Sequence, residues 1–422
     1  MPIIALTVAL RTSFFVFMTL LLAHSLLQRW YAARNAQRQR EQAERDRPGA
    51  APSVDIVIPC LDEEPELLED CCASVLKCQQ DYPGSAKVSV VDDGSRQRER
   101  LQPVYSRYEA LPGWQVIRKA HAGKRRAQDV AVRGGDGEIV VTVDSDTVLE
   151  PGALQAITVP FRNRRVGAVT GSIGVSNHSE NLLTRIIERQ YDFLFGHERA
   201  AQSACDTVLC CAGPFAAYRR AALSLVWNRY LNQKFLGLTC AAGDDIHLTN
   251  LVIGEDFRSV YKPHAAARTQ VPTAVRQYLR QQLRWYRSFY RELLWIMPLL
   301  PGRHPYLAVD IMARALVPLL LSLACLLSAL ELAGGHLGLF LHDLVPLGAM
   351  VLTAAVFVMV RARDIRLAPI ALLHAILLLV ARLHALGELW LHKEHWGTRG
   401  PGLELGEAEL TDLSDGSVID EA

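Results

Sequence analysis

The sequence predicts an α/β fold, a mostly parallel sheet flanked by helices, between apolar segments that suit a membrane. The 422 residues are 50% hydrophobic, apolar residues gather at the two ends, and short β-branched runs alternate with amphipathic stretches in the middle. The 45 basic and 44 acidic side chains nearly cancel, whereas a nucleic-acid-binding protein would carry a basic excess. We therefore expect a membrane-anchored protein with a substantial soluble domain and no nucleic-acid partner.

The first expected element is a transmembrane helix in residues 1–28. Residues 3–27 are nearly continuously apolar, and about 25 residues at 1.5 Å rise span a hydrocarbon core roughly 30 Å thick. A cleaved signal peptide is the disfavoured alternative, because no basic region precedes the apolar run. Arginines are frequent in residues 29–52, which we interpret as a basic linker on the cytoplasmic side by the positive-inside rule.

Residues 53–275 are expected to form the soluble domain. The runs that predict its strands are 54–59, 88–91, 114–118 and 139–143, with a helix at 65–78 after the first strand. The last run is almost wholly apolar, as a strand covered by helices on both faces should be. In such sheets ligands bind at the carboxyl ends of the strands, so the residues that follow each run are the candidate site.

Acidic clusters follow two of these strands directly. Asp92 and Asp93 come after the second strand, and Asp144 and Asp146 come after the fourth. Each cluster alone is compatible with ordinary turns and helix caps. Two clusters on successive strand ends favour a metal and diphosphate site, because Mg2+ is typically held by one or two carboxylates together with phosphate oxygens.

A basic pair, Lys124 and Arg125, follows Gly123 after the third strand. The spacing excludes a P-loop, since Arg118 stands where its first glycine would fall. A glycine before paired cations at the start of a helix still suits an anionic ligand. The alternative is a solvated basic helix face.

Five motifs in order resemble those of the processive family 2 glycosyltransferases. They are DDGS at 92–95, DSD at 144–146, GPxxxYRR at 213–220, GDD at 243–245 and QxxRW at 281–285. Residues 228–237 and 396–399 are similar to hyaluronan synthases, whereas residues 278–284 and the single apolar segment before the domain are similar to the rhizobial chitin-oligosaccharide synthase. The sequence departs from the family pattern at Leu61-Asp62-Glu63 and at Ile246, which leaves the sugar open more than the reaction type.

The resemblance implies a GT-A type domain and a role for each motif. Asp245 would be the general base, with Asp244 as the second catalytic carboxylate, and Asp144 and Asp146 would bind Mg2+ or Mn2+. The nucleotide-binding residues it implies are Asp92, Asp93, Lys124, Arg125, Gln281 and Arg284. The acceptor-binding residues are Trp285, Cys211, Gly213 and Tyr218, and the gating residues are Trp396 and Arg399.

The C-terminal part is expected to return to the membrane. Residues 276–300 would hold QxxRW and interfacial helices, and residues 306–399 the transmembrane and interfacial segments, with crossings at 307–332 and 344–360. The segment 367–391 is interrupted by charged residues, so it either crosses the bilayer or lies at its surface. The tail 400–422 is acidic and is expected to be disordered.

The expected function is processive, inverting sugar transfer from UDP-sugars in the plasma membrane, with a cytoplasmic catalytic domain, several membrane passes and secretion of the growing polysaccharide. The first hypothesis is hyaluronan synthesis from UDP-GlcNAc and UDP-GlcA. The alternative is synthesis of chitin oligosaccharides from UDP-GlcNAc alone, or of another β-glycan. A catalytically inactive membrane scaffold is disfavoured because the motif carboxylates Asp144, Asp146 and Asp245 are intact.

Overall fold

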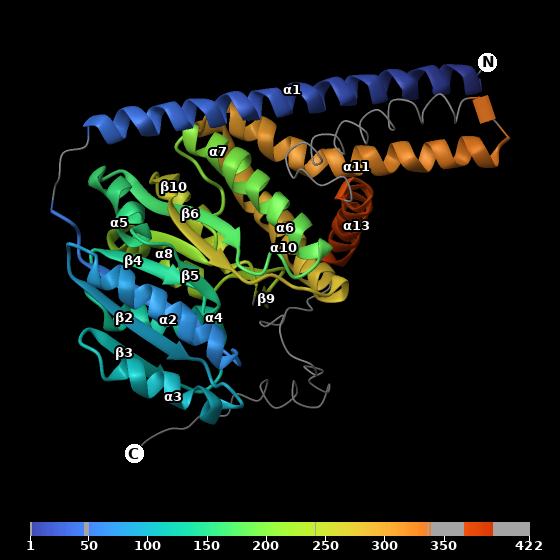
Figure 1. Ribbon diagram of the computed structural model, residues 1–422. Helices are drawn as coiled ribbons and strands as arrows, with labels where there is room; N and C mark the ends of the chain where they lie inside the picture. Colours follow the sequence, from blue (N-terminus) through green and yellow to red (C-terminus); the bar gives the residue numbers. More distant parts are fainter. Residues whose placement is uncertain (1, 46–49, 241, 336, 339–366, 391–422) are drawn as a thin grey trace.

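The computed structural model describes residues 2–45, 50–240, 242–335, 337–338 and 367–390 (Figure 1). The expected crossing at 344–360, the expected gating residues Trp396 and Arg399, and the expected acidic tail at 400–422 lie outside the described residues.

The soluble domain is built on an eight-stranded sheet in the order β3-β2-β1-β4-β7-β6-β10-β5. Strands β1, β2, β3 and β4 pair in parallel, whereas β7 is antiparallel to both β4 and β6. The eight strands are β1 (Val54–Cys60), β2 (Ala86–Asp92), β3 (Trp114–Arg118), β4 (Ile139–Val143), β5 (Thr147–Leu149), β6 (Val166–Val175), β7 (Phe215–Arg219) and β10 (Arg258–Thr269). The four expected strands are therefore confirmed. The strands β5, β6, β7 and β10 had no counterpart in the expectation.

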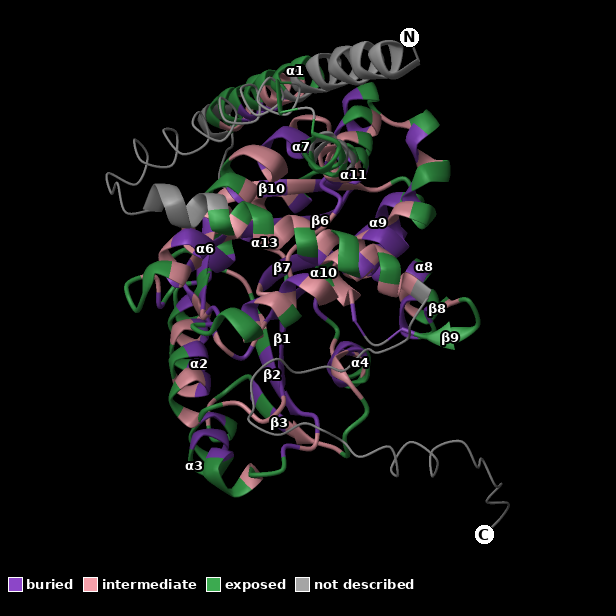
Figure 2. Cartoon of the chain, turned by 90° about the vertical axis from the view of Figure 1, so that its right-hand side faces the viewer, coloured by how far each residue is buried: buried purple, intermediate pink, exposed green. Residues whose placement is uncertain are grey.

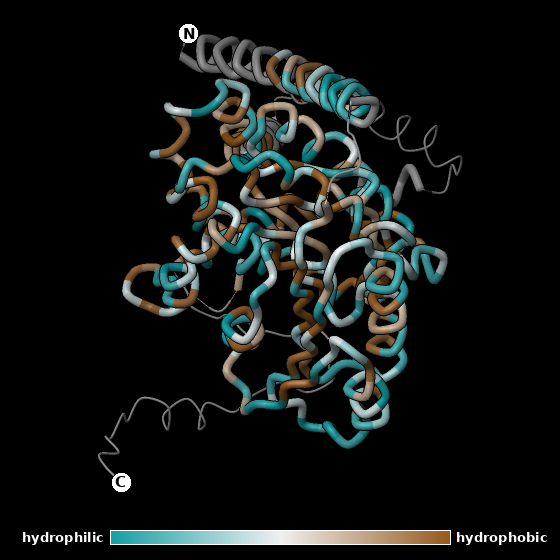
Figure 3. Tube along the Cα trace, turned by 90° about the vertical axis from the view of Figure 1, so that its left-hand side faces the viewer, coloured by the Kyte–Doolittle hydropathy of each residue, from teal (hydrophilic) through white to brown (hydrophobic). Residues whose placement is uncertain are grey.

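Helices cover both faces of this sheet (Figure 1). Along β1 the side chains of Ile56 and Ile58 enter one hydrophobic cluster, and that of Val57 enters the other. The central strands β1 and β4 are wholly buried (Figure 2), and apolar chain segments run through the middle of the molecule (Figure 3). The helices of the domain are α2 (Pro65–Gln80), α3 (Arg98–Glu109), α4 (Lys124–Gly134), α5 (Ala153–Thr158), α6 (Leu182–Phe193), α7 (Ala200–Ala204), α8 (Arg220–Leu231) and α9 (Asp244–Gly254).

The N-terminal region differs from the expected division into an anchor and a linker. It is one continuous helix, α1 (Pro2–Arg45), which lies against α7 and α11 (Figure 1). The helix continues through most of the expected linker because Ala, Gln, Arg and Glu dominate that stretch, and these residues have high helix propensity. Its last turns hold the soluble domain directly: Gln39 Nε2 donates to the Tyr261 carbonyl oxygen at 2.8 Å, and Arg38 pairs with Asp206 at 2.9 Å.

In the described part of the chain, three α-helices follow the domain: α10 (Val275–Ile296), α11 (Pro305–Ala333) and α13 (Leu367–Gly387). Among the described residues, one helix stretch, Pro305–Ser322 of α11, is long and apolar enough to cross a membrane. Helix α13 packs on α10, where Tyr278 Oη and His374 Nε2 lie 2.6 Å apart and Arg382 stacks over Tyr286. The crossing or interfacial position of residues 367–391 and the number of membrane passes stay predictions.

Candidate active site

The first acidic pair is held at the end of β2 by neighbouring loops. The fully buried Asp92 carboxylate accepts hydrogen bonds from the Ser95 backbone N–H at 2.8 Å and from Arg98 Nε at 2.5 Å. Asp93, also fully buried, accepts from the backbone N–H groups of Ala122 and Gly123 at 3.1 and 2.8 Å. These carboxylates therefore hold in place the loops that follow β2 and β3, and their expected contact with a nucleotide stays a prediction.

The second acidic pair follows β4. Asp144 Oδ1 accepts a hydrogen bond from Lys124 Nζ at 2.7 Å, and Asp146 Oδ1 accepts one from the Thr269 hydroxyl at 3.1 Å. Burial raises the pKa of Asp144, and the charge of Asp146 raises it further. The two negative charges repel each other, so a nearby cation would favour the ionised form of both carboxylates.

The GDD motif begins helix α9. Gly243 has a φ of +80°, a left-handed conformation that favours glycine, and it places Asp244 and Asp245 in the first turn. Asp245 Oδ2 accepts from the Gly213 backbone N–H at 3.3 Å. Burial raises the pKa of Asp245, and so does the neighbouring charge of Asp244. A carboxylate with a raised pKa is a stronger proton acceptor than an ordinary one.

Lys124 joins the two sets of carboxylates. Besides its bond to Asp144, its ammonium lies 3.4 Å from Asp244 Oδ2. Burial opposes the charged form of Lys124, but the surrounding carboxylates raise its pKa overall. Burial likewise disfavours the charged form of Asp244, but the positive charges of Lys124 and two arginines lower its pKa overall. The structure therefore brings the expected Lys124, Asp144 and Asp244 into one cluster.

Gly213 borders this cluster from the side of β7. A Cβ atom at this position would lie 3.3 Å from Lys124 Nζ and 3.4 Å from Asp144 Oδ2. Cys210 lies on the same segment, with its sulfur 3.5 Å from Asp245 Oδ2. The segment before β7 thus lies beside both Asp144, the expected metal ligand, and the GDD carboxylate Asp245.

The QxxRW residues lie on α10. The charge of Arg284 is one of those that lower the pKa of Asp244. Trp285 is 36% exposed, and its ring lies 6.5 Å from that of Tyr191 on α6. Gln281 has a buried side-chain oxygen with no hydrogen-bond partner among the described residues.

The structure places three expected site residues away from an open surface. Cys211 and Tyr218 lie in the hydrophobic core, because on β7 Tyr218 points into the layer beneath the sheet. Arg125 is buried, where it donates to the Tyr230 carbonyl at 2.9 Å and stacks on the ring of that tyrosine. All three side chains are enclosed by protein, and their expected contacts with acceptor and nucleotide stay predictions.

Two residues near the site were not expected from the sequence as functional residues. Thr269 binds Asp146 from the end of β10, and Glu63 Oε2 accepts a hydrogen bond from the Ser145 hydroxyl at 2.8 Å. No motif marks Thr269. Glu63 does lie in a recognisable position, directly after β1, where the sequence departs from the family pattern.

The residues present fit a divalent cation. The described residues contain no cluster of three or more His, Cys, Asp or Glu side chains that would hold a metal on its own. Asp144 and Asp146 nevertheless supply the one or two carboxylates that Mg2+ or Mn2+ needs when phosphate oxygens complete the shell. The Lys124 ammonium on Asp144 indicates that this carboxylate accepts a cation partner.

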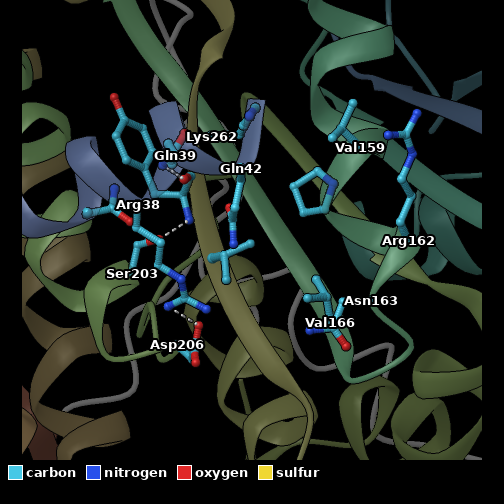
Figure 4. A pocket seen from close by; sticks show the side chains of 14 residues that line it. Arg38, Gln39, Gln42, Val159, Arg162, Asn163, Val166, Ser203, Asp206 and Lys262 are labelled. Carbon is cyan, nitrogen blue, oxygen red and sulfur yellow. Dashed lines mark hydrogen bonds and ion pairs between the residues drawn. The ribbon is translucent and has the colours of Figure 1, made fainter. Parts of the chain in front are cut away.

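A separate cavity of about 170 Å3 lies between α1, residues 159–163 and the strands β6 and β10 (Figure 4). Its lining includes Arg38, Gln39, Arg162, Asp206 and Lys262, and none of the motif carboxylates. The cavity is therefore distinct from the carboxylate cluster.

Comparison with known proteins decides the family. Residues 51–288 match the family described as glycosyltransferase like family 2. The chain belongs to this family. It is therefore a glycosyltransferase, and the inactive-scaffold alternative loses its support.

Two relatives of this glycosyltransferase are named N-acetylglucosaminyltransferases. An N-acetylglucosaminyltransferase of Sinorhizobium fredii is 39% identical over 362 residues, which cover 83% of this chain and 85% of that protein. An N-acetylglucosaminyltransferase of Mesorhizobium japonicum is 43% identical over 276 residues, or 65% of each chain. The expected likeness to the rhizobial enzymes is thus confirmed, whereas a specific likeness to hyaluronan synthases is not.

The fold has a solved counterpart. The mannosyltransferase PcManGT from Pyrobaculum calidifontis, in complex with GDP-Man and Mn2+, has a TM-score of 0.61 and covers 90% of this chain and 99% of its own, at 20% identity. At this identity the likeness bears on the fold alone. Together with the family match, it confirms the expected GT-A type domain in this glycosyltransferase.

Proposed function

We propose that this glycosyltransferase transfers N-acetylglucosamine from UDP-GlcNAc to the growing end of a β-linked chain, as a chitin-oligosaccharide synthase. One observation carries the proposal: Lys124 bridges Asp144 and Asp244 at the ends of separate elements, with the Asp245 carboxylate held beside them by Gly213. The relatives named N-acetylglucosaminyltransferase supply the identity of the sugar.

Asp245 is the proposed general base. Its carboxylate would take the proton of the acceptor hydroxyl while the hydroxyl oxygen bonds to C1 of the donor sugar and the C1–diphosphate bond breaks. Attack from the face opposite UDP turns an α-linked donor into a β-linkage. Asp244 is kept ionised by Lys124, and its charge raises the pKa of Asp245, which makes Asp245 the better proton acceptor of the two. General-base catalysis of this kind typically contributes about 10²–10⁴-fold.

Asp144 and Asp146 are the proposed holders of Mg2+ or Mn2+. The ion would supply charge neutralisation for the leaving diphosphate. The side chains of Lys124 and Arg284, which both lower the pKa of Asp244, would add further positive charge near the diphosphate.

Asp92, Asp93 and Gln281 are proposed to shape the nucleotide side of the site. The two aspartates would do so through the loops they hold, and Gln281 through its unpartnered side-chain oxygen, which accepts an N–H or O–H donor. Arg125 would act from beneath, by supporting the segment before α9 through its bond to the Tyr230 carbonyl.

The acceptor is proposed to lie along Trp285 and Gly213. An exposed indole offers a flat apolar face on which a sugar ring stacks, and a glycine leaves room for it next to the carboxylates. Cys211 and Tyr218 would then support this surface from the core.

A lipid bilayer is the proposed location, with the catalytic domain on its cytoplasmic side. Large apolar side chains are exposed on the outer faces of α10, α11 and α13, among them Trp295, Met312, Leu316, Leu320, Ile376 and Val380. Such a surface is stable in contact with lipid and unfavourable in water. Multi-pass insertion, secretion of the polymer, and gating by Trp396 and Arg399 remain parts of this proposal.

Membranes containing the protein, supplied with Mg2+ or Mn2+ and radiolabelled donors, test the function. We expect polymer label from UDP-GlcNAc alone and digestion of the product by chitinase. A requirement for both UDP-GlcNAc and UDP-GlcA, with a product sensitive to hyaluronidase, would favour the second candidate function, hyaluronan synthesis. Residues 228–237, which are similar to hyaluronan synthases, are the observation behind that candidate. Absence of incorporation from either donor contradicts both.

A further inference from the structure

A buried carboxylate outside the motifs joins the two helices that carry the proposed chemistry. Glu292 on α10 is 1% exposed, yet three side chains from other elements surround its carboxylate. His247 Nδ1 lies 3.0 Å from Oε1, Gln233 Nε2 donates to Oε1 at 2.5 Å, and Asn250 Nδ2 donates to Oε2 at 3.3 Å. An ionised carboxylate only accepts hydrogen bonds, so the histidine carries its proton on Nδ1.

The Glu292 carboxylate contacts α9 through His247. His247 follows Asp245 by two positions, and because successive helical residues turn by about 100°, the two side chains leave opposite sides of the helix. The side of α9 opposite Asp245 is therefore fixed to α10 through Glu292, while the Asp245 carboxylate is held by the Gly213 backbone N–H. The ring of Trp295, one turn further along α10, meets the His247 ring edge-on at 5.7 Å.

A second contact brings the same two helices close together. A Cβ atom at Gly243 would lie 2.7 Å from Ser288 Oγ and 3.0 Å from a guanidinium nitrogen of Arg291, so α10 packs directly on the backbone that enters α9. Arg291 also donates to the Ala242 carbonyl at 2.6 Å. The separation of α9 and α10 is thus set at a glycine contact and at a buried ionic contact.

We propose that Glu292 is a positioning residue for sugar transfer: by holding His247, it fixes the helix that begins with the GDD carboxylates against the helix that carries QxxRW. The inference rests on the proposed function, in which the base lies on α9 and the acceptor surface on α10. Reacting groups must be aligned to within about an ångström, and a small displacement costs on the order of 10²-fold in rate. A loosened contact leaves the donor bound and lets water compete with the misplaced acceptor.

Glu292→Gln is the test variant, because it keeps the volume and removes the acceptor-only charge. We expect kcat for transfer to fall at least about 10-fold, with KM for UDP-GlcNAc changed less than about 3-fold. The decisive readout is the ratio of UDP-GlcNAc hydrolysis to sugar transfer, which should rise. A residue that only stabilises the fold would lower both reactions together.

His247 variants test the link itself. His247→Phe should reproduce the Glu292→Gln ratio, and the double variant should be no worse than either single one. His247→Asn, whose amide nitrogen can stand near the position of Nδ1, should restore much of the transfer. Glu255→Gln is the matched control, since Glu255 pairs with Arg229 on the surface at the other end of α9 and should behave as wild type.

The outcomes separate two failures. A wild-type protein without UDP-GlcNAc transfer contradicts the proposed function. If the wild type is active, an unchanged hydrolysis ratio in Glu292→Gln and His247→Phe, or additive losses in the double variant, overturns the positioning role, even where the melting temperature falls.

Discussion

Lys124 Nζ lies 2.7 Å from Asp144 Oδ1, which ties the first turn of α4 to the end of β4. The two residues come from separate motifs, and the ammonium extends toward a third, the GDD carboxylates. A single cation therefore offsets the mutual repulsion of carboxylates from distant parts of the chain, and it does so at the end of the sheet where a diphosphate is expected.

Lys124→Met should destabilise the protein and abolish transfer. Removal of one partner of a buried ion pair typically costs about 3–5 kcal/mol, and the Lys124 side chain is only 12% exposed. Because the folded state raises the lysine pKa, this stabilisation is fully present below the unfolded lysine pKa of about 10.4 and is lost only as pH rises above it. Thermal unfolding in detergent at pH 7 measures the loss. Lys87→Met, which breaks an exposed pair with Asp136, is the control and should change little.

Asp245→Asn should abolish transfer while UDP binding stays near that of the wild type. In the wild type, the raised pKa of Asp245 moves the acid limb of the kcat profile above the ordinary carboxyl range near pH 4, because only the ionised form accepts a proton. Rates measured from pH 4 to 8, with UDP binding by calorimetry at each pH, check both statements. Near-normal turnover of Asp245→Asn would refute the base assignment.

Thr269→Val should weaken metal binding without removing a carboxylate. The Thr269 hydroxyl donates to Asp146 Oδ1, and loss of a group that orients a metal ligand commonly costs about 10–100-fold in affinity. Mn2+ titration followed by electron paramagnetic resonance measures the affinity, with Asp146→Asn as the stronger variant. Thr158→Val, at a hydroxyl that binds a helix carbonyl remote from the site, should leave the affinity unaltered.

Gly243→Ala should lose both stability and activity. The residue has a φ of +80°, and an added Cβ would meet Ser288 Oγ at 2.7 Å, so α9 and α10 would be forced apart. Gly237→Ala is the matched control, since its φ of +86° imposes similar backbone strain but no atom lies within 4 Å. We expect turnover per folded molecule to fall in the first variant alone. Equal turnover in both would show that the close approach is not needed.

Asp310→Asn should loosen the attachment of α11 to the rest of the protein. Asp310 is fully buried, accepts from Gln202 at 2.8 Å and from Arg314 at 3.0 Å, and lies 3.1 Å from His24 on α1. Loss of its charge removes one of the two carboxylate partners of the buried Arg314, which keeps its pair with Glu198 at 2.6 Å, so the cost should be only part of the roughly 3–5 kcal/mol typical of a broken buried pair. The melting temperature in detergent should drop by several degrees. Asp192→Asn, which breaks an exposed pair with Arg189, should leave it unchanged.

Local patterns were sufficient for the first half of the domain. The runs at 114–118 and 139–143 are strands with the expected bounds. At 139–143 every residue is β-branched and buried, as expected of a strand covered on both faces. The antiparallel strand β7 was not predicted. Its side chains are all buried, as they would be in a parallel strand, so the residues of this short strand do not indicate the direction in which it pairs.

By itself, the sequence determined the family, the order of the motifs and the carboxylates that follow β2 and β4, because these depend on residue identity and on adjacency in the chain. Only the tertiary structure decided which side chains meet. It turned Arg125 and Tyr218 inward, and it paired Lys124 with Asp144 and Glu292 with His247. The physical reason is that contacts between distant segments depend on how sheet and helices pack, and a buried charge takes the partner that packing brings within reach.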